Sequence, residues 1–404
     1  MSEQQKQRKD RAVAIFMAIV ALTGLALGLS DSIISNYFYD AFGVDAFERG
    51  MIEFPREMPG VISVLIVSGF AFLGNIKLAI IAQALSIIGI FALGLIQPSF
   101  SIMLIFLFIN SLGMHLFMPL YDSIGMSLAN KGKFGTIMGK FNGFRTAFSL
   151  LAGVLVFFGF RFGFFSFQTP IIVPFIIAGI LLTGVLILLI VMRKYTDDIK
   201  AEKTKFILKK SYFKYYLLAF LFGARKQIMY VYAPWVLIEL LGFGADNMAL
   251  LIITGSAIGI FFIPMVGKWI DKYGTANIMI IEACLFLVIY LGYGIVSAGL
   301  HGGWLLNVPI VVAAAVAVNI IDRMTIQFGM VRNVYMRSIA ETPEDVTPTL
   351  ATGMALDHIV SIVSAMFCGW LWFEFGPQYV FVFAAVLALG NIIVAMTIKR
   401  KKIN

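Results

Sequence analysis

The chain has 404 residues, of which 60% are hydrophobic and only 13% are charged. Soluble domains have about 45–50% apolar and about 25% charged residues, so this composition excludes a soluble enzyme and a disordered scaffold and indicates a polytopic membrane protein. The formal net charge is +9. Loop topology and attraction to anionic lipid head groups explain that charge without nucleic acid.

Twelve apolar runs follow one another along the chain. A helix of about 20 apolar residues crosses the hydrocarbon layer. Lipid offers backbone N–H and C=O groups no hydrogen-bond partner, so a chain crosses it only as helices or as a closed barrel. We therefore expect membrane-spanning helices at 12–37, 50–73, 76–96, 101–128, 136–160, 171–192, 215–241, 248–266, 278–298, 308–335, 350–375 and 379–398. The first run is long and lacks a convincing cleavage site, so we expect it to remain as the first helix.

The connecting segments predict the orientation of the chain. Cytoplasmic loops hold the excess of Lys and Arg in membrane proteins. If the N-terminus is inside, the outer segments hold only Arg49 and Arg161, and the other loop Lys and Arg fall on inner segments. The pattern predicts a multi-pass protein of the cell (inner or plasma) membrane with both termini cytoplasmic.

The longest polar segment divides the chain after the sixth expected helix. It is rich in Lys and spans residues 193–214. We therefore predict an N-terminal six-helix bundle at 1–192, a cytoplasmic basic linker at 193–214 and a C-terminal six-helix bundle at 215–404. Two such bundles can rock against each other around a midplane site, which is the basis of alternating access.

One loop carries a family resemblance. Between the expected eighth and ninth helices the sequence reads Gly-Lys-Trp-Ile-Asp-Lys-Tyr-Gly at 267–274. It matches the G-x-x-x-D-x-x-G loop of the major facilitator superfamily, which the chain resembles over essentially its whole length. The resemblance implies an all-α integral membrane fold with twelve transmembrane helices in two pseudo-symmetric six-helix bundles. It also implies a gating role for Gly267, Asp271 and Gly274.

The resemblance has departures that bear on function. The corresponding first-half loop has Leu73 where the family has Asp. The fifth helix lacks the Gly-Pro-rich pattern of the family's drug–proton antiporters, and the fourth helix lacks their arginine and has Asn110 near that position. In this family helices 1, 4, 7 and 10 line a central cavity, so polar residues on those helices are the first candidates for a binding site.

Basic residues inside the expected spans are candidate substrate contacts. A charge at the bilayer centre costs about 2.5–3.5 kcal/mol on insertion scales, so each is a site candidate. Arginine keeps its charge and can grip carboxylate or phosphate oxygens with two parallel bonds. The predicted substrate-binding residues are Arg145, Arg225, Lys226, Tyr232, Asn319 and Arg323. Tyr232 is included because it lies seven residues after Arg225, on the same helix face.

Acidic residues and histidines inside the spans are candidates for carrying protons. Burial and neighbouring charge can move a carboxylate or imidazole toward neutral titration. The predicted proton-coupling residues are Asp31, His115, Asp122, Asp322, Asp357 and His358. Glu53, Arg56 and Glu57 share a short stretch with Pro55 and Pro59 and predict a salt-bridged outer gate, or else an edge of the binding site. Structural pairing is the alternative for several of these charges, as for Glu53 with Arg56 and for Asp322 with Arg323.

The leading functional hypothesis is a proton-coupled secondary active transporter of a small organic anion or zwitterion. The alternatives are a proton-driven exporter of amphipathic or toxic compounds and a non-transporting sensor on a transporter fold. The chain has no nucleotide-binding G-x-x-x-x-G-K-[ST] loop, no metal motif and no nucleophile–base pair at diagnostic spacing. We therefore expect no enzymatic activity, no cofactor and no metal. The expected partners are a small-molecule substrate, protons and the lipid bilayer, with no nucleic acid, for a protein that works as a monomer.

Overall fold

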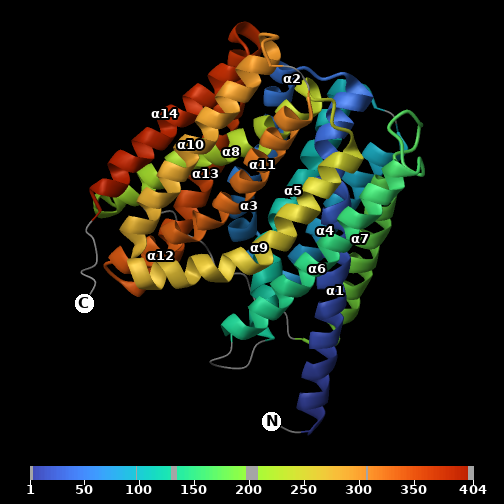
Figure 1. The fold of residues 1–404 in the computed structure, drawn as a ribbon. Helices are drawn as coiled ribbons and strands as arrows, with labels where there is room; N and C mark the ends of the chain where they lie inside the picture. Colours follow the sequence, from blue (N-terminus) through green and yellow to red (C-terminus); the bar gives the residue numbers. More distant parts are fainter. Residues whose placement is uncertain (1–2, 97, 129–133, 197–207, 306–307, 399–404) are drawn as a thin grey trace. The chain divides into compact units, whose positions relative to one another are not determined.

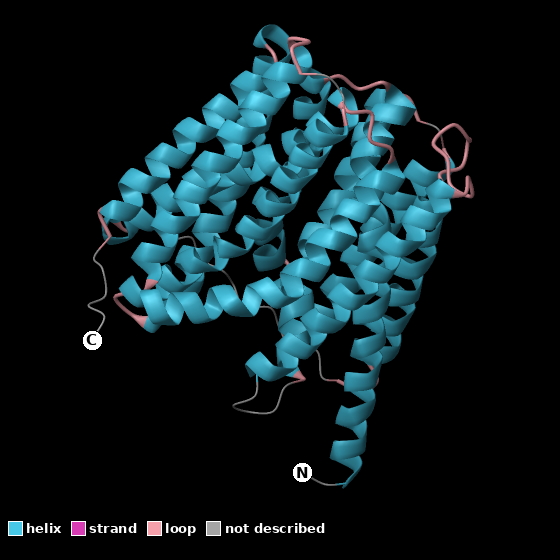
Figure 2. Ribbon diagram, viewed as in Figure 1, coloured by secondary structure: helices cyan, strands magenta, loops and turns pink. Residues whose placement is uncertain are grey.

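The computed structural model describes residues 3–96, 98–128, 134–196, 208–305 and 308–398. All regular elements among these residues are helices (Figure 2). By length and composition, ten helices of this part of the chain can cross a membrane. The other two expected spans, 50–73 and 215–241, are also helical but are interrupted and carry internal charges.

The described chain forms two compact units. Unit 1 consists of Met1–Phe42, Met58–Thr204 and Ala245–Ile252, and unit 2 of Gly43–Glu57, Lys205–Gly244 and Ile253–Asn404. By its contacts, the start of the second expected span therefore belongs with the later half of the sequence. The linker predicted at 193–214 falls partly on residues 197–207, which lie outside the described residues.

Unit 1 is a bundle of five long helices, together with the later part of one further helix and the first residues of another, Ala245–Ile252. The five long helices are α1 (Glu3–Asn36), α4 (Asn75–Leu95), α5 (Phe100–Ser127), α6 (Phe134–Arg161) and α7 (Val173–Met192), joined by part of α3 (Glu53–Gly69). Two short turns, η1 (Tyr37–Ala41) and η2 (Ala71–Leu73), follow α1 and α3. Phe16, Phe117, Tyr121, Phe141 and Leu189 belong to one buried core that draws on α1, α5, α6 and α7.

Glycine allows α1 and α6 to approach closely in unit 1. A β-carbon at Gly28 would lie 2.7 Å from the β-carbon of Ala152 and 2.7 Å from the carbonyl oxygen of Ser149. Without a strong hydrophobic drive between helices in lipid, such small-residue contacts hold membrane helices together.

Unit 2 contains more and shorter elements, labelled in Figure 1. They are α2 (Ala46–Met51), η3 (Lys210–Tyr212), α8 (Phe213–Trp235), η4 (Val236–Leu240), most of α9 (Ala245–Tyr273), α10 (Thr275–His301), α11 (Pro309–Thr325), η5 (Ile326–Gly329), α12 (Met330–Ile339), η6 (Pro343–Asp345), α13 (Val346–Phe375) and α14 (Pro377–Met396). Tyr212, Tyr215, Ile270, Phe328 and Met336 share a buried core at one end of the unit.

The tenth expected span is seen as one span, Pro309–Ile339, whose α-helix tightens into a 3₁₀ turn in the middle. A single helix was expected at 308–335, but α11 ends at Thr325, a tight turn occupies Ile326–Gly329, and α12 begins at Met330. Gly329 leaves space for the side chain of Arg332, whose Nη2 would lie 2.9 Å from a β-carbon at that position. The turn at Ile326–Gly329 therefore lies next to a buried arginine, Arg332.

Two loops share one backbone conformation. Gly74, before α4, has φ 86° and ψ 159°, and Gly274, before α10, has φ 79° and ψ 159°. Residues with a side chain rarely adopt these angles, so glycine is needed at both turns. Pairing Gly74 with Gly274 places Ala71 opposite Asp271. The residue that replaces the family's Asp is thus Ala71, two positions before the Leu73 that the sequence register indicated.

The end of the predicted linker is attached to unit 2 by polar contacts. The Lys209 ammonium donates to Oδ2 of Asp345 at 2.5 Å, and the Tyr212 hydroxyl donates to the same oxygen at 2.6 Å. The backbone N–H of Glu341 donates to the Tyr212 hydroxyl at 2.9 Å. These bonds from Lys209 and Tyr212 hold the pKa of Asp345 below its usual value, and the bond to Asp345 raises the pKa of Lys209.

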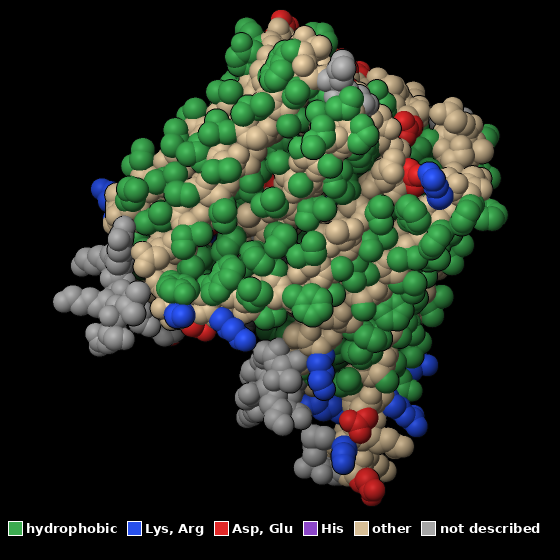
Figure 3. All heavy atoms as spheres, in the orientation of Figure 1, with side chains coloured by type: hydrophobic (Ala, Val, Ile, Leu, Met, Phe, Trp, Pro, Cys, Tyr) green, Lys and Arg blue, Asp and Glu red, His purple; other side chains and the backbone are tan. Residues whose placement is uncertain are grey.

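The surface of the helices is apolar where lipid is expected. Leu65, Ile105, Val288 and Ile393 each expose more than half of their side chains. In the view of Figure 3, hydrophobic side chains cover the helices, whereas Lys, Arg, Asp and Glu gather around the N-terminal end of α1. This distribution is that of a protein whose helices face hydrocarbon and whose helix ends face water.

Candidate functional site

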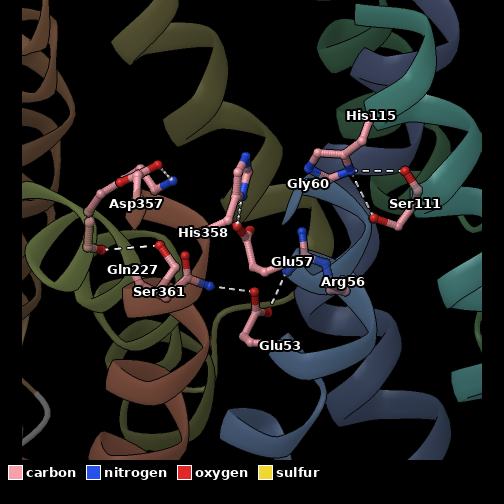
Figure 4. Close-up of polar contacts among 12 residues, drawn as sticks. Glu53, Arg56, Glu57, Gly60, Ser111, His115, Gln227, Asp357, His358 and Ser361 are labelled. Atoms are coloured by element: carbon pink, nitrogen blue, oxygen red, sulfur yellow. Dashed lines mark hydrogen bonds and ion pairs between the residues drawn. The ribbon is translucent and has the colours of Figure 1, made fainter. Parts of the chain in front are cut away.

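Unit 2 holds a cluster of charged side chains drawn from four helices, which we call the α3–α13 cluster (Figure 4). Its members are Arg49 of α2, Glu53, Arg56 and Glu57 of α3, Lys226 and Gln227 of α8, and Asp357 and His358 of α13. The cluster unites residues that the sequence assigned to three different roles, in gating, substrate binding and proton coupling.

Glu53 is at the centre of one half of the cluster. Its fully buried Oε1 accepts from Nη1 of Arg49 at 2.5 Å and from Nη1 of Arg56 at 2.6 Å. The side-chain amide of Gln227 donates to the other oxygen, Oε2. Burying a carboxylate is costly unless it is paired and hydrogen-bonded, and this carboxylate accepts from two guanidinium groups and an amide.

Arg49 corrects a sequence assignment. The orientation argument counted it as a charge of an outer loop, but its side chain is fully buried in α2. Its position four residues before Glu53 was the available signal for this pair, because residues four apart share a helix face. The pairing of Glu53 with Arg56, three residues apart, is seen as expected.

Two further ion pairs form the other half of the cluster. Nδ1 of His358 lies 2.7 Å from Oε2 of Glu57, and the ammonium of Lys226 lies 2.6 Å from Oδ2 of Asp357. The second oxygen of Asp357, Oδ1, is buried and has no hydrogen-bond partner among the described residues. Lys226 also acts electrostatically on Glu57. The two carboxylates, Glu57 and Asp357, thus lie close to the two basic groups, Lys226 and His358.

The α8–α13 contact positions this half of the cluster. A β-carbon at Gly223 would lie 2.7 Å from Oδ1 of Asp357, so glycine is required for the approach. Ser361 and Ser364 donate to the carbonyl oxygens of Gly223 and Ala224 at 3.2 and 3.3 Å. The polar stripe of α13 therefore joins the two helices and fixes the neighbouring ion pairs.

Tyr232 contributes to the same packing. Its side chain is fully buried and its hydroxyl donates to the carbonyl oxygen of Ala365 at 2.5 Å. The structure thus gives the hydroxyl a structural contact with α13, and its predicted substrate role stays a prediction.

A second group of charges in unit 2, the α11 cluster, comprises Arg225 of α8, Glu282 of α10, Asn319, Asp322 and Arg323 of α11, and Arg332 of α12. Oε1 of Glu282 accepts from Arg225 at 3.2 Å and from Arg332 at 3.3 Å. The Arg225 guanidinium carbon lies 3.2 Å from the ring centre of Phe286, and that of Arg332 lies 3.4 Å from the ring centre of Phe222. Both arginines are therefore held on more than one side.

The α11 residues differ in their surroundings. Nε of Arg323 donates to the amide oxygen of Asn319 at 3.0 Å. Asp322 is fully buried, and neither of its carboxylate oxygens has a hydrogen-bond partner among the described residues. Glu282 and Arg332 were not among the predicted site residues. For Glu282 the available signal was that it is a lone glutamate inside the apolar run 278–298.

The remaining predicted substrate-binding and proton-coupling residues lie in unit 1. The Arg145 guanidinium carbon is 5.5 Å from the ring centre of Tyr121, and its charge acts on the adjacent Asp122. Nδ1 of His115 lies 2.9 Å from the carbonyl oxygen of Ser111 one turn earlier. Asp31 is exposed on α1. The structure thus joins Asp122 with Arg145 and shows separate surroundings for His115.

The predicted gating loop has an open arrangement. Asp271 is exposed in the last turn of α9, and a β-carbon at Gly267 would meet no atom within 4 Å. Gly274 ends α9 and begins α10, and its N–H donates to the carbonyl oxygen of Ile270 at 2.9 Å. Of the three glycine and aspartate positions, Gly274 is the one whose backbone angles require its residue type.

Metal coordination finds no support in the described part of the chain. There, no group of three or more His, Cys, Asp or Glu side chains is arranged to hold a metal ion. Cys284 and Cys368 are free thiols.

The Major Facilitator Superfamily model matches residues 16–341. Because this match covers most of the chain, the protein belongs to that family. It is a multi-pass membrane protein with the twelve-helix, two-bundle major facilitator fold, and membership of this family identifies it as a secondary transporter.

Solved transporter structures resemble the whole chain at low sequence identity. A mutant of the nucleoside transporter NupG has 14% identity and a TM-score of 0.74, with 95% of this chain and 99% of that chain covered. A POT family transporter in complex with 5-aminolevulinic acid has 12% identity and a TM-score of 0.76, with 96% and 95% covered. A bacterial homologue of the iron transporter ferroportin, in an inward-facing state, has 12% identity and a TM-score of 0.70, with 98% and 99% covered. No curated protein matches the sequence significantly. At such identities the likeness shows the fold alone.

Proposed function

We propose that the protein moves a small organic anion or zwitterion by alternating access, coupled to protons, in the cell membrane with both termini cytoplasmic. The observation that supports this most is the α3–α13 cluster, where the Lys226–Asp357 and Glu57–His358 pairs adjoin. It combines a cation that can bind a carboxylate with groups that can exchange a proton.

The chemistry follows from competition for Lys226. A substrate carboxylate that binds the Lys226 ammonium removes the counter-charge of Asp357, one of whose oxygens is already buried without a hydrogen bond. A partly buried carboxylate without its counter-charge favours the protonated form. Substrate binding at Lys226 therefore promotes proton uptake at Asp357, and the two ligands bind cooperatively.

The Glu57–His358 pair extends the same logic to a zwitterion. A substrate amine that binds Glu57 competes with His358 for that carboxylate, which is 2.7 Å from the imidazole. An imidazole released from a carboxylate binds its proton less tightly. A solute with one carboxylate and one amine thus fits both pairs, whereas a simple anion engages only Lys226.

The test is solute flux in proteoliposomes. The full-length protein is reconstituted and a panel of small carboxylates and amino acids is screened for accumulation driven by an imposed pH gradient. We expect accumulation of at least one such solute. Asp357→Asn should lower gradient-driven accumulation on the order of tenfold or more, because site-to-site coupling is worth about 1–3 kcal/mol, while solute exchange at equal pH persists.

Asp10→Asn is the matched control, because Asp10 is an exposed aspartate near the start of α1. It should transport like the wild type. Accumulation that does not depend on the pH gradient in the wild type would remove the proton coupling from the proposal, and transport confined to uncharged solutes would remove the substrate class.

A further inference from the structure

Arg323 differs from the other basic residues of the tenth expected span and its neighbours. Arg225 and Arg332 share the carboxylate of Glu282, and Lys226 is paired with Asp357. Arg323, by contrast, donates to the neutral amide of Asn319. Within the described residues no carboxylate lies at ion-pair distance from Arg323. Its side chain is only partly buried.

Asp322 is the neighbour of Arg323 in sequence and has the opposite environment. It is fully buried with both carboxylate oxygens lacking a hydrogen bond. The cations that act on it are Arg225 of α8 and Arg323 of α11. From α10 it faces the buried side chains of Tyr290 and Tyr293, and Glu282 lies two to three turns earlier on that helix.

Arg225 is held more firmly than Arg323 and is therefore less able to exchange its present contacts for a bound anion. It is almost completely buried, bonded to Glu282 and packed against the ring of Phe286. Arg332, after the 3₁₀ turn, is bonded to the same carboxylate. Glu282 therefore offsets only one of these two positive charges. Asp322 is the carboxylate on which both Arg225 and Arg323 act, and Arg323 is the less firmly held of the two.

We propose that Asp322 and Arg323 form a charge switch in which the ionised Asp322 offsets the charge of Arg323 and the protonated Asp322 leaves Arg323 free to bind an anionic group. The ligand of Arg323 is a carboxylate or phosphate group, since a guanidinium binds both through paired N–H donors. The proton comes from water that reaches α11 and adds to a carboxylate oxygen of Asp322. This inference rests on the proposed function, to which it adds a second proton site beside an anion site.

The energetic reasoning is local. A buried carboxylate without hydrogen bonds is unfavourable in its charged form unless nearby cations compensate it. Arg225 and Arg323 provide that compensation, and an anion bound to Arg323 removes part of it. Anion binding and protonation of Asp322 therefore favour each other, which is the thermodynamic requirement for moving both together.

The experiment needs no substrate. Infrared spectra of the full-length protein in lipid nanodiscs are recorded across pH, and the carbonyl stretch of protonated carboxylic acids is followed. We expect a carbonyl band of a protonated acid that is absent in Asp322→Asn and present in Glu282→Gln. We also expect a larger protonated fraction at a given pH in Arg323→Gln, because the variant loses a cation that favours ionised Asp322. Asp10→Asn controls for the loss of an exposed carboxylate.

Two results would overturn the switch: a protonated-acid signal that persists in Asp322→Asn, or a titration in Arg323→Gln that matches the wild type. Thermal unfolding of each variant shows whether it is folded, and Arg323→Lys, which keeps the charge, should titrate like the wild type. The spectra contain no transported solute, so the switch can fail while proteoliposome flux remains proton-coupled, and flux can fail while Asp322 titrates as described.

Discussion

Glu53 is a single carboxylate on which three other buried or half-buried groups depend. We predict that Glu53→Gln destabilises the protein by about 3–5 kcal/mol, because it removes one partner of a buried ion pair with the guanidinium of Arg49. The measurement is thermal unfolding in detergent, in which the variant should melt well below the wild type.

Glu48→Gln is the control for this substitution. Glu48 lies five residues earlier on α2, is partly exposed, and accepts from the backbone of Asp45 in a capping box. Its replacement should cost no more than about 1 kcal/mol. Equal melting of Glu53→Gln and the wild type would show that Glu53 does not compensate Arg49.

Asp345 predicts a pH dependence outside the membrane spans. Bonds from Lys209 and Tyr212 lower its pKa, so the pair contributes stability above the ordinary aspartate pKa of about 3.9 and loses it as the pH falls further. For Lys209 the pKa is raised, so its contribution is present below about pH 10.4 and is lost as the pH rises above that value.

The difference in melting temperature between the wild type and Asp345→Asn tests this prediction. It should be constant between about pH 6 and 8 and should shrink as the pH falls below about 4. A difference that already vanishes near pH 6 would show that the Lys209–Asp345 pair is not the source of the stability.

Single residues also show where sequence reasoning ends. Residue type and spacing predicted the Glu53–Arg56 pair, because both lie on one helix. They could not predict Glu57 with His358, or Arg225 with Glu282, because these pairs join helices far apart in the sequence and depend on which faces pack. Gln227 was missed because a neutral side chain beside Lys226 carries no charge signal of its own.

At the scale of helices, close glycine contacts govern packing in unit 1. We predict that Gly28→Ala destabilises the protein by about 1–3 kcal/mol, because its β-carbon would lie 2.7 Å from Ala152 and Ser149 of α6. Thermal unfolding measures the effect.

Gly139→Ala is the matched control. Gly139 is exposed on α6, and a β-carbon there would meet no atom within 4 Å. Since alanine favours helix by about 1 kcal/mol over glycine, this variant should be neutral or slightly more stable. If both variants melt alike, the α1–α6 contact is looser than the structure shows.

Most of the helices could be predicted from the sequence, and the differences between their predicted and observed ends have one cause. Apolar runs mark where a helix meets lipid, but a helix continues into water as long as its backbone bonds are kept. The first helix therefore begins at Glu3 rather than residue 12, and α9 continues to Tyr273 rather than ending at 266. The 3₁₀ turn at Ile326–Gly329 was missed because hydropathy does not respond to backbone geometry.

At the scale of the whole molecule, the distribution of basic loop residues predicts orientation. We expect a fluorescent protein fused to the C-terminus to be fluorescent and an alkaline phosphatase fused there to be inactive in a bacterial host, because both results require a cytoplasmic end. An active phosphatase fusion would show that the C-terminus lies outside the cytoplasm, which would contradict the predicted orientation. It would leave the fold unchanged, because the family match does not depend on direction.

The matching angles at Gly74 and Gly274 have a stereochemical consequence. Both residues occupy a region that mirror-image amino acids prefer. D-alanine introduced at residue 274 by chemical ligation should therefore preserve the turn, whereas L-alanine should strain it. The backbone angles at these two turns thus set a requirement for handedness, and it is the same in both halves of the sequence.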